Sequence, residues 1–255
     1  MLRQPFGGVK KSAIGFGRKV GIYNYITQFL RLSTEGADEN LRQTPLSESL
    51  QKIHSAHKEA LAQASLMAQS YAYHYEKEFS QAKDYVKIRG EENLFSYTPI
   101  KSLCFRICER DSLQDMLGVI IAAHISKVPL DISYEADSSL IGELQGLCKE
   151  AGLGCRFLQE SLHSCALRVR EYERVRYHAL PCQEDLLYLA TSKEAKIIIR
   201  DKPLLNGRFE LLFYHNEKAL SISYHRYANN RSSGNLFDRA YRHKAHQDMR
   251  LPKIA

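Results

Sequence analysis

The sequence is poor in the residues and patterns of fibrous, unfolded and membrane-spanning chains. Its 255 residues include only 7 Pro and 14 Gly, too few for a collagen-like or low-complexity chain. No apolar run approaches the ~20 residues that a membrane-spanning helix needs. Hydrophobic residues make up 44% of the chain and charged residues 25%, and a chain of this length buries an ordinary core without disulfide staples. The composition therefore predicts a soluble globular protein.

The cysteines lack the regular spacing of a disulfide framework or a zinc finger. They sit in apolar or mixed runs with no leader segment before them, which predicts reduced core cysteines in a cytoplasmic protein. Cys104 and Cys108 would share one face of a strand about 13 Å apart, too far for a disulfide. Cys182 is the one thiol whose surroundings suit a nucleophile, although a structural role is favoured. The six cysteines are Cys104, Cys108, Cys148, Cys155, Cys165 and Cys182.

The formal net charge of +7 is concentrated at the two ends of the chain. Residues 1–34 carry +6 with no acidic residue, residues 231–255 carry +4, and residues 35–230 therefore carry −3. A mildly acidic body is a poor surface for nucleic acid, because phosphate binding depends on clustered basic side chains. No nucleic-acid partner is expected, apart from weak contacts of a basic tail.

The N-terminal third predicts a docking segment and then helices. Residues 1–29 are Gly-rich and basic before they become aromatic, so we expect them to dock on a partner or to continue a longer chain. Residues 31–43 are typical of a linker. From Thr44 to about Val86, apolar residues recur at helical intervals, which predicts one long helix or two helices joined end to end. Three histidines lack a carboxylate or Cys at ligand spacing, so we expect them on the surface and predict no metal site. They are His54, His57 and His74.

After Gly90 the hydrophobic period alternates between two and 3.6 residues, which is typical of alternating strands and helices. Two βα units in tandem predict a parallel sheet with right-handed crossovers. The isoleucine run at 197–199 predicts a buried strand at the centre of that sheet, and residues 209–213 and 219–224 are predicted to pair. The expected strands are residues 102–108, 130–134, 155–158 and 196–200, and the expected helices are residues 112–126 with Asp111 as cap, 138–151 and 184–190.

Gly15, Gly17 and Gly21 form a loop that is only superficially similar to a nucleotide-binding loop. No strand precedes it, and the third glycine falls one place late for the dinucleotide fingerprint. The glycines instead indicate a backbone with unusual φ values that presents its N–H groups closely, with an anion as one candidate.

Residues 221–227 combine strand alternation with aromatic and basic groups, which suits docking against another subunit or chain. No carboxylate evident from the sequence orients His225, so an interface is favoured over acid–base catalysis. The predicted interface residues are Tyr224, His225, Arg226 and Tyr227.

Residues 3–12, which read Arg-Gln-Pro-Phe-Gly-Gly-Val-Lys-Lys-Ser, resemble a loop near the C-terminus of aldehyde dehydrogenases. The continuation through residues 15–26 is similar to the glutamate-semialdehyde branch within bifunctional proline utilisation proteins. Residues 90–93 resemble the start of an extra C-terminal domain in that family, and residues 206–212 with 225–227 resemble its end. The resemblance therefore spans most of residues 3–230.

The resemblance implies an α/β fold with a Rossmann-like, mostly parallel sheet of the aldehyde dehydrogenase type. A partial dehydrogenase tail and a long helical segment would precede this sheet. The implied divisions are residues 1–34 as the incomplete dehydrogenase tail, 35–92 as a helical connection, 93–230 as a lid-like α/β domain and 231–255 as a basic tail.

The resemblance also implies a function. In the family, the extra domain lacks nucleotide-binding activity, covers the tunnel between two active sites and supports assembly. Lys19, Val20 and Gly21 match the loop whose backbone N–H groups hold the semialdehyde carboxylate. The catalytic Cys and the cofactor site would lie before residue 1, so no catalytic, cofactor-binding or metal-ligating residue is expected in this chain.

The longer protein would oxidise proline to glutamate with FAD and NAD in the cytoplasm, passing electrons to quinones as a peripheral membrane protein. Its proline dehydrogenase and aldehyde dehydrogenase domains would be the partners of this segment, with a second copy of the protein as a further expectation. The alternative is a stand-alone α/β module that binds a small anionic ligand and carries a basic docking arm.

Overall fold

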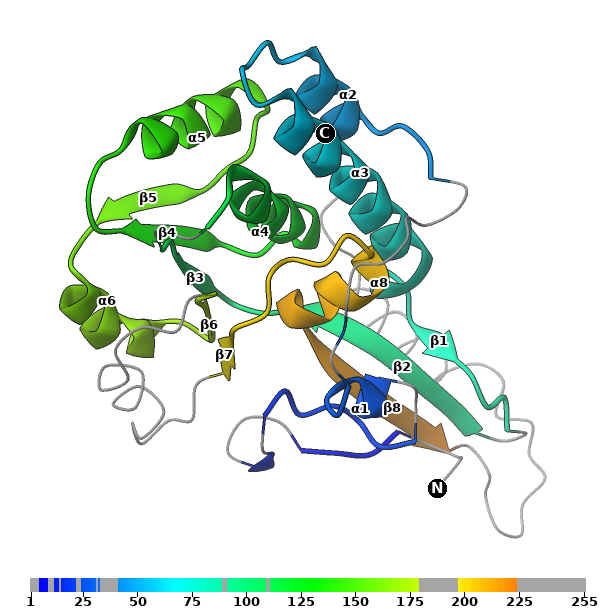
Figure 1. Cartoon of the computed structure of the whole chain (residues 1–255). Coiled ribbons are helices and arrows are strands. Elements are labelled where there is room, and N and C mark those ends of the chain that lie inside the picture. The colour runs from blue at the N-terminus through cyan, green and yellow to red at the C-terminus, as the bar shows by residue number, and fades with distance from the viewer. Residues whose placement is uncertain are drawn as a thin grey trace, which may run out of the picture.

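The chain folds around two β-sheets covered by helices (Figure 1). This computed structural model describes residues 5–8, 12–13, 15–21, 24–30, 32, 41–88, 91–108, 111–178 and 197–223. Within these residues, one sheet has five strands and the other has three. The predicted α/β class is confirmed. None of the described helices combines the length and the apolar character that a membrane crossing requires.

The five-stranded sheet is parallel throughout, as the tandem βα pattern predicts. Its strand order, β5-β4-β3-β6-β7, runs outward in both directions from β3, which is the order of doubly wound nucleotide-binding folds. The predicted central position of the isoleucine run is wrong, because β7 lies at the edge of the described sheet and only Ile199 is fully buried. The strands are β3 (Leu103–Arg106), β4 (Leu130–Tyr134), β5 (Arg156–Gln159), β6 (Arg174–Arg176) and β7 (Ile197–Ile199).

The helices of this region begin at serine caps. α4 (Leu113–Ser126) is capped by Ser112, whose hydroxyl accepts the N–H of Asp115 at 3.1 Å. The predicted cap, Asp111, is therefore wrong by one residue; its carboxylate instead accepts the N–H of Cys108 at 2.8 Å. The remaining elements are α5 (Ser139–Glu150), α6 (Leu162–Arg168) and the 3₁₀ turn Val169–Glu171.

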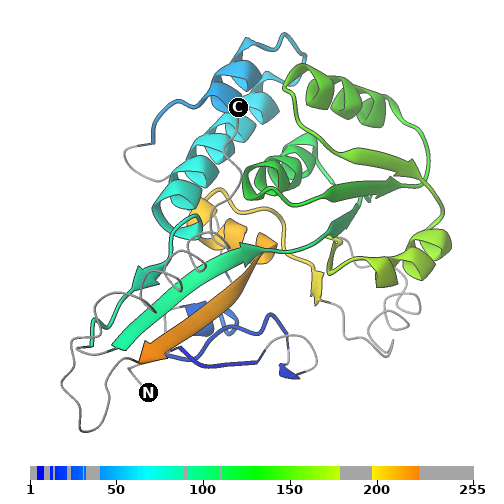
Figure 2. The ribbon, with the colours of Figure 1, turned by 180° about the vertical axis from the view of Figure 1, so that it is seen from behind.

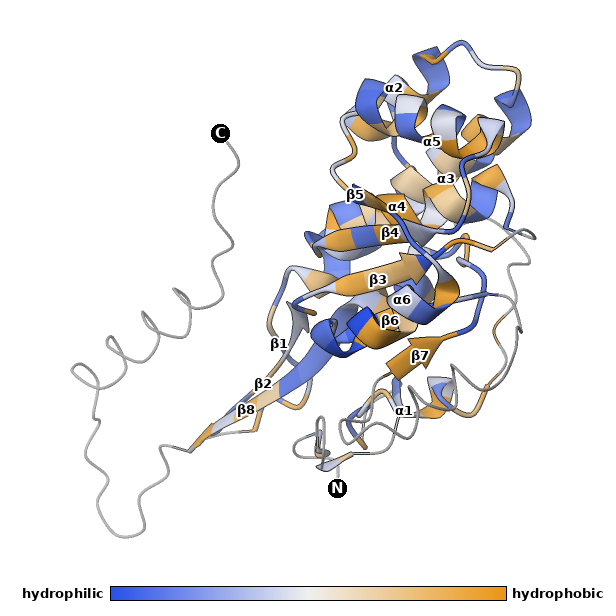
Figure 3. Cartoon of the chain, turned by 90° about the vertical axis from the view of Figure 1, so that its left-hand side faces the viewer, coloured by the Kyte–Doolittle hydropathy of each residue, from blue (hydrophilic) through white to orange (hydrophobic). Residues whose placement is uncertain are grey.

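The N-terminal helices lie side by side instead of end to end. α2 (Pro45–Lys52) begins at Thr44 as predicted and ends where Ile53 turns to extended backbone and buries its side chain. α3 (Lys58–His74) continues into a π-helical turn, Tyr75–Phe79. The Ser65 hydroxyl donates to the Ser47 carbonyl at 3.2 Å, which ties α3 to α2. Figure 3 shows α2, α3 and α5 gathered at the end of the molecule away from the second sheet.

The second sheet is an antiparallel ribbon that extends from the body of the molecule (Figure 2). β2 (Glu91–Pro99) pairs with β8 (His215–Ser223) along nine residues of each strand, and β1 (Lys83–Asp84) flanks β2. The predicted strand at 209–213 is wrong. That segment forms α8 (Gly207–Glu210) and the 3₁₀ turn Leu211–Tyr214, because the Asn206 side chain caps the N–H of Arg208 at 2.9 Å.

One expected element and the C-terminal tail lie outside the described residues. These are the predicted helix 184–190 and residues 224–255. Before the helices, the described part of residues 5–32 includes one short helix, α1 (Asn24–Thr27).

Candidate functional site

Lys19, Val20 and Gly21 lie in the N-terminal segment beside β8. Val20 and Phe6 exchange two backbone hydrogen bonds of 2.7 and 3.0 Å, so the loop is closed on itself. The N–H of Lys19 donates to the Glu217 carboxylate at 2.5 Å, and the Lys19 ammonium donates to the Gly7 carbonyl. Gly21 has a φ of 96° and is exposed. Two of the three backbone N–H groups therefore already have acceptors within the chain.

Glu217 brings a carboxylate to the N–H of Lys19. Glu217 is 5% exposed and projects from β8. It also accepts from the Asn24 amide at 3.0 Å and pairs with Arg18 at 3.5 Å. The loop therefore binds a carboxylate through its backbone, as the glycine pattern indicates, but the carboxylate comes from this same chain.

Three arginines lie near Phe16, Asn24 and the start of β8. Arg18 donates to the Leu212 carbonyl at 2.8 Å. Arg174 is fully buried, and all its acceptors among the described residues are carbonyl or amide oxygens. Arg208 pairs with Glu78 at 2.9 Å and donates to Asn24 at 2.6 Å. We call Arg18, Arg174 and Arg208 the arginine cluster.

Burial disfavours positive charge on Arg18, Arg174 and His215. Desolvation lowers the pKa of Arg18 despite its ion pair with Glu217. Desolvation, with repulsion from Arg18, lowers the pKa of Arg174 to about 9. His215, at the start of β8, has its pKa lowered to about 4, mainly by desolvation. Keeping these buried groups positively charged therefore costs free energy, and a bound anion would reduce that cost.

Unsatisfied polar atoms concentrate at the same place. In the described part of the chain, five buried side-chain nitrogen or oxygen atoms lack a hydrogen-bond partner, and four of them belong to the arginine cluster or to His215. Buried donors without acceptors are rare in folded proteins. These four atoms are Arg18 Nη1, Arg174 Nε, Arg208 Nη1 and His215 Nε2.

The carboxyl ends of β3 and β6 form the crevice where doubly wound folds bind nucleotides. No glycine-rich turn leads into α4, and two acidic residues stand at its N-terminus. Asp111 pairs with His178 at 2.9 Å, and Asp115 pairs with Lys202 at 2.8 Å. Because these carboxylates occupy the helix end that would face a pyrophosphate, the residues present do not fit a dinucleotide.

Two of the described cysteines, Cys104 and Cys165, form a thiol pair. Cys104 is buried on β3 and its thiol bonds with that of Cys165. This bond and burial raise the pKa of Cys104, which keeps the thiol protonated and unreactive. Within the described ranges no three His, Cys, Asp or Glu side chains are placed to hold a metal ion. Cys182 lies outside those ranges.

The sequence predictions locate only part of this site. They single out Lys19, Val20 and Gly21, but they miss the arginine cluster and Glu217. Arg174, Arg208 and Glu217 are far from the loop in sequence. A glycine-flanked Arg18 is the only local signal. The predicted interface residues Tyr224, His225, Arg226 and Tyr227 lie outside the described residues, directly after β8. Of the three surface histidines, His57 pairs with Glu143 at 2.9 Å.

The sequence matches no family model and no curated protein. Among solved structures, it is similar to Proline Utilization A (PutA) from Corynebacterium freiburgense, with 24% identity over 88% of this chain and a TM-score of 0.53. This chain covers 19% of that protein's length. An aldehyde dehydrogenase from Burkholderia cenocepacia has 14% identity over 60% of this chain and 34% of its own, with a TM-score of 0.46. PutA from Bdellovibrio bacteriovorus has 14% identity over 52% of this chain and 15% of its own, with a TM-score of 0.41. The chain therefore shares a fold with part of PutA from Corynebacterium freiburgense.

Proposed function

We propose that this chain is a non-catalytic segment of a bifunctional proline-oxidising protein, in which it covers the channel between two active sites and supports assembly. The observation that carries the proposal is the exposed apolar surface of residues 6–30. Six of the ten exposed large hydrophobic side chains in the described chain lie there. Such concentration is typical of a docking surface. The six are Phe6, Val20, Tyr25, Ile26, Phe29 and Leu30.

The docking partner in this proposal is the aldehyde dehydrogenase domain of the same protein. The shared fold with PutA supports this partner, and so does the likeness of residues 3–12 to a dehydrogenase loop. The longer protein would hold FAD and NAD on its other domains, act in the cytoplasm and contact the membrane peripherally. The acidic N-terminus of α4 supports a segment without a nucleotide of its own.

The proposal gives Lys19, Val20 and Gly21 a substrate role in the longer protein. Their backbone would hold the carboxylate of the semialdehyde. Because Glu217 occupies the N–H of Lys19 at 2.5 Å, the role requires that Glu217 releases this group when the dehydrogenase domain is present. The aldehyde-oxidising chemistry itself would belong to the other domains.

A second candidate is a stand-alone module for a small anion, which the arginine cluster favours. Calorimetric titration of the purified chain with NAD and with glutamate separates the two. If the chain is a cover for the channel, we expect no saturable heat of binding with either NAD or glutamate. Saturable binding of NAD or glutamate by this chain alone would favour the module and count against the cover.

The coding sequence upstream of Met1 provides a further test of the cover. We expect the reading frame to continue back through a dehydrogenase domain that contains a catalytic Cys. Co-expression of both parts should then yield one complex on size exclusion, which Phe6→Ser and Phe29→Ser weaken. A reading frame that is interrupted directly upstream of Met1, with no dehydrogenase gene beside it, would contradict the proposal.

A further inference from the structure

The described chain holds two pairs of cysteines whose thiols are hydrogen-bonded to each other. One pair is Cys104 and Cys165, and the other is Cys148 and Cys155. All four are free thiols. Cys104 and Cys165 are 0% and 3% exposed, and Cys148 is buried as well, whereas Cys155 is half-buried. Of the two pairs, only the second therefore has a member at the surface.

The turn at the end of α5 brings Cys148 and Cys155 together. Gly152 follows the helix with a φ of 69°, the left-handed conformation that commonly ends helices. The Leu153 N–H donates to the Cys148 carbonyl at 2.8 Å. The Gly152 N–H donates to the Lys149 carbonyl at 3.3 Å. These two bonds form a Schellman turn, which sends the chain back along the helix, and Cys155 meets Cys148 directly before β5 begins.

The hydrogen bond between the two thiols gives them different roles. The Cys148 thiol is the donor, and this bond raises the pKa of Cys148 and lowers the pKa of Cys155. The thiolate, and not the thiol, is the form that attacks an oxidant. Cys155 is therefore the sulfur that reacts first, and Cys148 is the neighbouring thiol that resolves the product.

The turn leaves room for the two sulfur atoms to reach bonding distance. A Cβ atom on Gly152 or on Gly154 would meet nothing within 4 Å, and both glycines are exposed. Cys148 belongs to the main cluster of buried residues, so its position is fixed by packing. The movement that closes an S–S bond of about 2.05 Å therefore falls on the open side of the turn, which carries Cys155.

We propose that Cys148 and Cys155 form a modification site that hydrogen peroxide converts into a disulfide, which fastens the end of α5 to the start of β5. The Cys155 sulfur attacks one peroxide oxygen, so an S–O bond forms, the O–O bond breaks and the leaving hydroxide takes the thiol proton as water. The Cys148 sulfur then attacks the sulfenic sulfur, so an S–S bond forms, the S–O bond breaks and a second water leaves with the Cys148 proton. The two thiols lose two electrons and two protons, which the peroxide gains.

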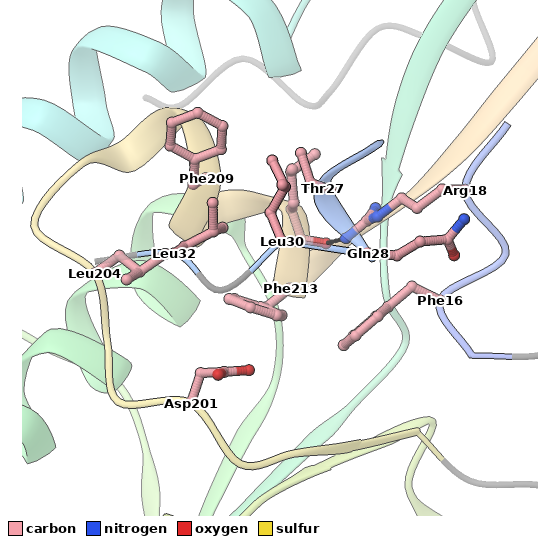
Figure 4. A pocket seen from close by; sticks show the side chains of 11 residues that line it. Phe16, Arg18, Thr27, Gln28, Leu30, Leu32, Asp201, Leu204, Phe209 and Phe213 are labelled. Carbon is pink, nitrogen blue, oxygen red and sulfur yellow. Dashed lines mark hydrogen bonds between the residues drawn. The ribbon is translucent and has the colours of Figure 1, made fainter. Parts of the chain in front are cut away.

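This site is separate from the N-terminal segment and from the cavity beside it. That cavity has a volume of about 130 Å³ and is lined by residues between 16 and 32 and between 201 and 213 (Figure 4). Figure 1 shows α5 and β5 on the opposite side of the molecule from β2 and β8. The proposal therefore does not rest on the cover function or on the docking of residues 6–30.

The test treats the full, reduced 255-residue chain with hydrogen peroxide. Remaining thiols are blocked with N-ethylmaleimide in urea, and the chain is digested with trypsin without reductant. Trypsin cuts after Lys149 and Arg156, so the two cysteines fall in peptides 128–149 and 150–156. We expect the mass spectrum to show these peptides joined, with two hydrogen atoms fewer than their sum.

The buried pair is an internal control for access. Cys104 and Cys165 fall in peptides 102–106 and 157–168 of the same digest. Because neither thiol reaches the surface, we expect these peptides to join at least about tenfold more slowly than peptides 128–149 and 150–156.

Three serine variants assign the roles within the pair. Cys148→Ser should stop at the Cys155 sulfenic acid, which dimedone traps on peptide 150–156. Cys155→Ser should leave Cys148 unmodified, because Cys148 is buried. Cys108→Ser removes a half-buried thiol outside the pair and should leave the joined peptides unchanged.

Hydrogen exchange measures the fastening of the turn. The Leu153 N–H is bonded to the Cys148 carbonyl, so its exchange requires the turn to open, and the disulfide opposes this opening. We expect the Leu153 N–H to exchange about tenfold or more slowly after oxidation and to return to its first rate after reduction with dithiothreitol. The Glu48 N–H of α2, bonded to the Thr44 carbonyl at 2.9 Å, should exchange at the same rate in both forms.

Three outcomes would overturn the proposal. The first is that peptides 128–149 and 150–156 stay separate after peroxide treatment of the folded chain. The second is that the peptides of Cys104 and Cys165 join as fast, which would mean that exposure does not select the reacting pair. The third is equal exchange of the Leu153 N–H in the reduced and oxidised chains.

Discussion

The side chains of Arg176 and Glu210 form an ion pair in the interior, and neither has any exposed surface. The Tyr214 hydroxyl bonds with both partners, at 2.9 Å to Arg176 and 3.1 Å to Glu210. Burial opposes the charged form of Arg176, but the Glu210 carboxylate outweighs this and raises the arginine pKa. Each charge is therefore tolerated only because the other is present.

Glu210→Gln should destabilise the fold by about 3–5 kcal/mol, because it leaves a buried guanidinium without its counter-ion. The double substitution Arg176→Met and Glu210→Leu should cost less, since no charge then remains inside. Urea unfolding measures both. Glu76→Gln removes a carboxylate that is 75% exposed in a 3.8 Å pair with Lys77 and should change stability by no more than about 0.5 kcal/mol. A double variant as unstable as Glu210→Gln alone would argue against this account.

His215 makes stability depend on pH. Burial lowers its pKa to about 4, whereas an unfolded histidine titrates near ~6.5. The unfolded chain therefore binds more protons between these values, and stability falls as pH drops through this window. We expect a loss of about 2 kcal/mol between pH 7 and pH 5 from this residue. Desolvation also lowers the pKa of His124 on α4, which acts in the same direction.

The pH effect is tested by chemical denaturation of His215→Phe across the same range. The variant should show a flatter dependence whatever its absolute stability, because the phenyl ring has no proton to bind. His54→Gln, at an exposed position, serves as the control and should keep the wild-type slope. An unchanged slope in His215→Phe would mean that other groups carry the pH dependence.

At the scale of elements, α8 approaches α3 more closely than a side chain would allow. A Cβ atom on Gly207 would lie 2.7 Å from both the Ser70 carbonyl oxygen and the Tyr71 Cα. The Gly207 N–H also donates to the Ser70 hydroxyl at 2.8 Å. The contact needs glycine for lack of space, since both obstructing atoms are backbone.

Gly207→Ala should therefore destabilise the fold by about 1–3 kcal/mol, the range for overpacking a tight contact. Gly146→Ala is the matched control, because a Cβ there meets nothing within 4 Å and the residue lies inside α5. Alanine in a helix interior should stabilise by about 0.5–1 kcal/mol. Thermal melts of the two variants should shift in opposite directions, and a shift in the same direction would refute the argument.

The elements that the sequence predicts well are those with a strong local signal. α4 follows from its apolar run and β4 from its boundaries, which agree with residues 130–134. β2 and β6 carry no such signal, because their polar residues find partners only in the folded chain. Arg174 and Arg176 are fully buried on β6, whereas a hydrophobicity pattern predicts that arginines lie on the surface.

At the scale of the whole molecule, the helices, the parallel sheet and the ribbon share one core. The largest cluster of buried residues includes Leu50 of α2, Met67 of α3, Phe95 of β2, Leu103 of β3 and Tyr214. A continuous core is expected to unfold cooperatively. The division between residues 35–92 and 93–230 thus stays a prediction that unfolding can test.

Urea unfolding should show one transition, with coincident midpoints by circular dichroism and by tyrosine fluorescence. Met67→Ala should lower both midpoints together, at a cost of about 2–5 kcal/mol for a buried side chain. Tyr73→Ala, on the exposed side of α3, serves as the control. An early separate transition of the helical signal would instead support an independent connection.

The sequence by itself determines the α/β class, the parallel βα units and the resemblance of residues 3–12, because periodicity and short motifs are local properties. Only the tertiary structure decides that β2 pairs with β8, that Glu217 reaches the N–H of Lys19, and that Arg18 lines a cavity beside Phe213. These contacts join residues more than 100 positions apart. The energies of these contacts depend on how deeply each residue is buried and on which partner it meets. The sequence around each residue encodes neither property.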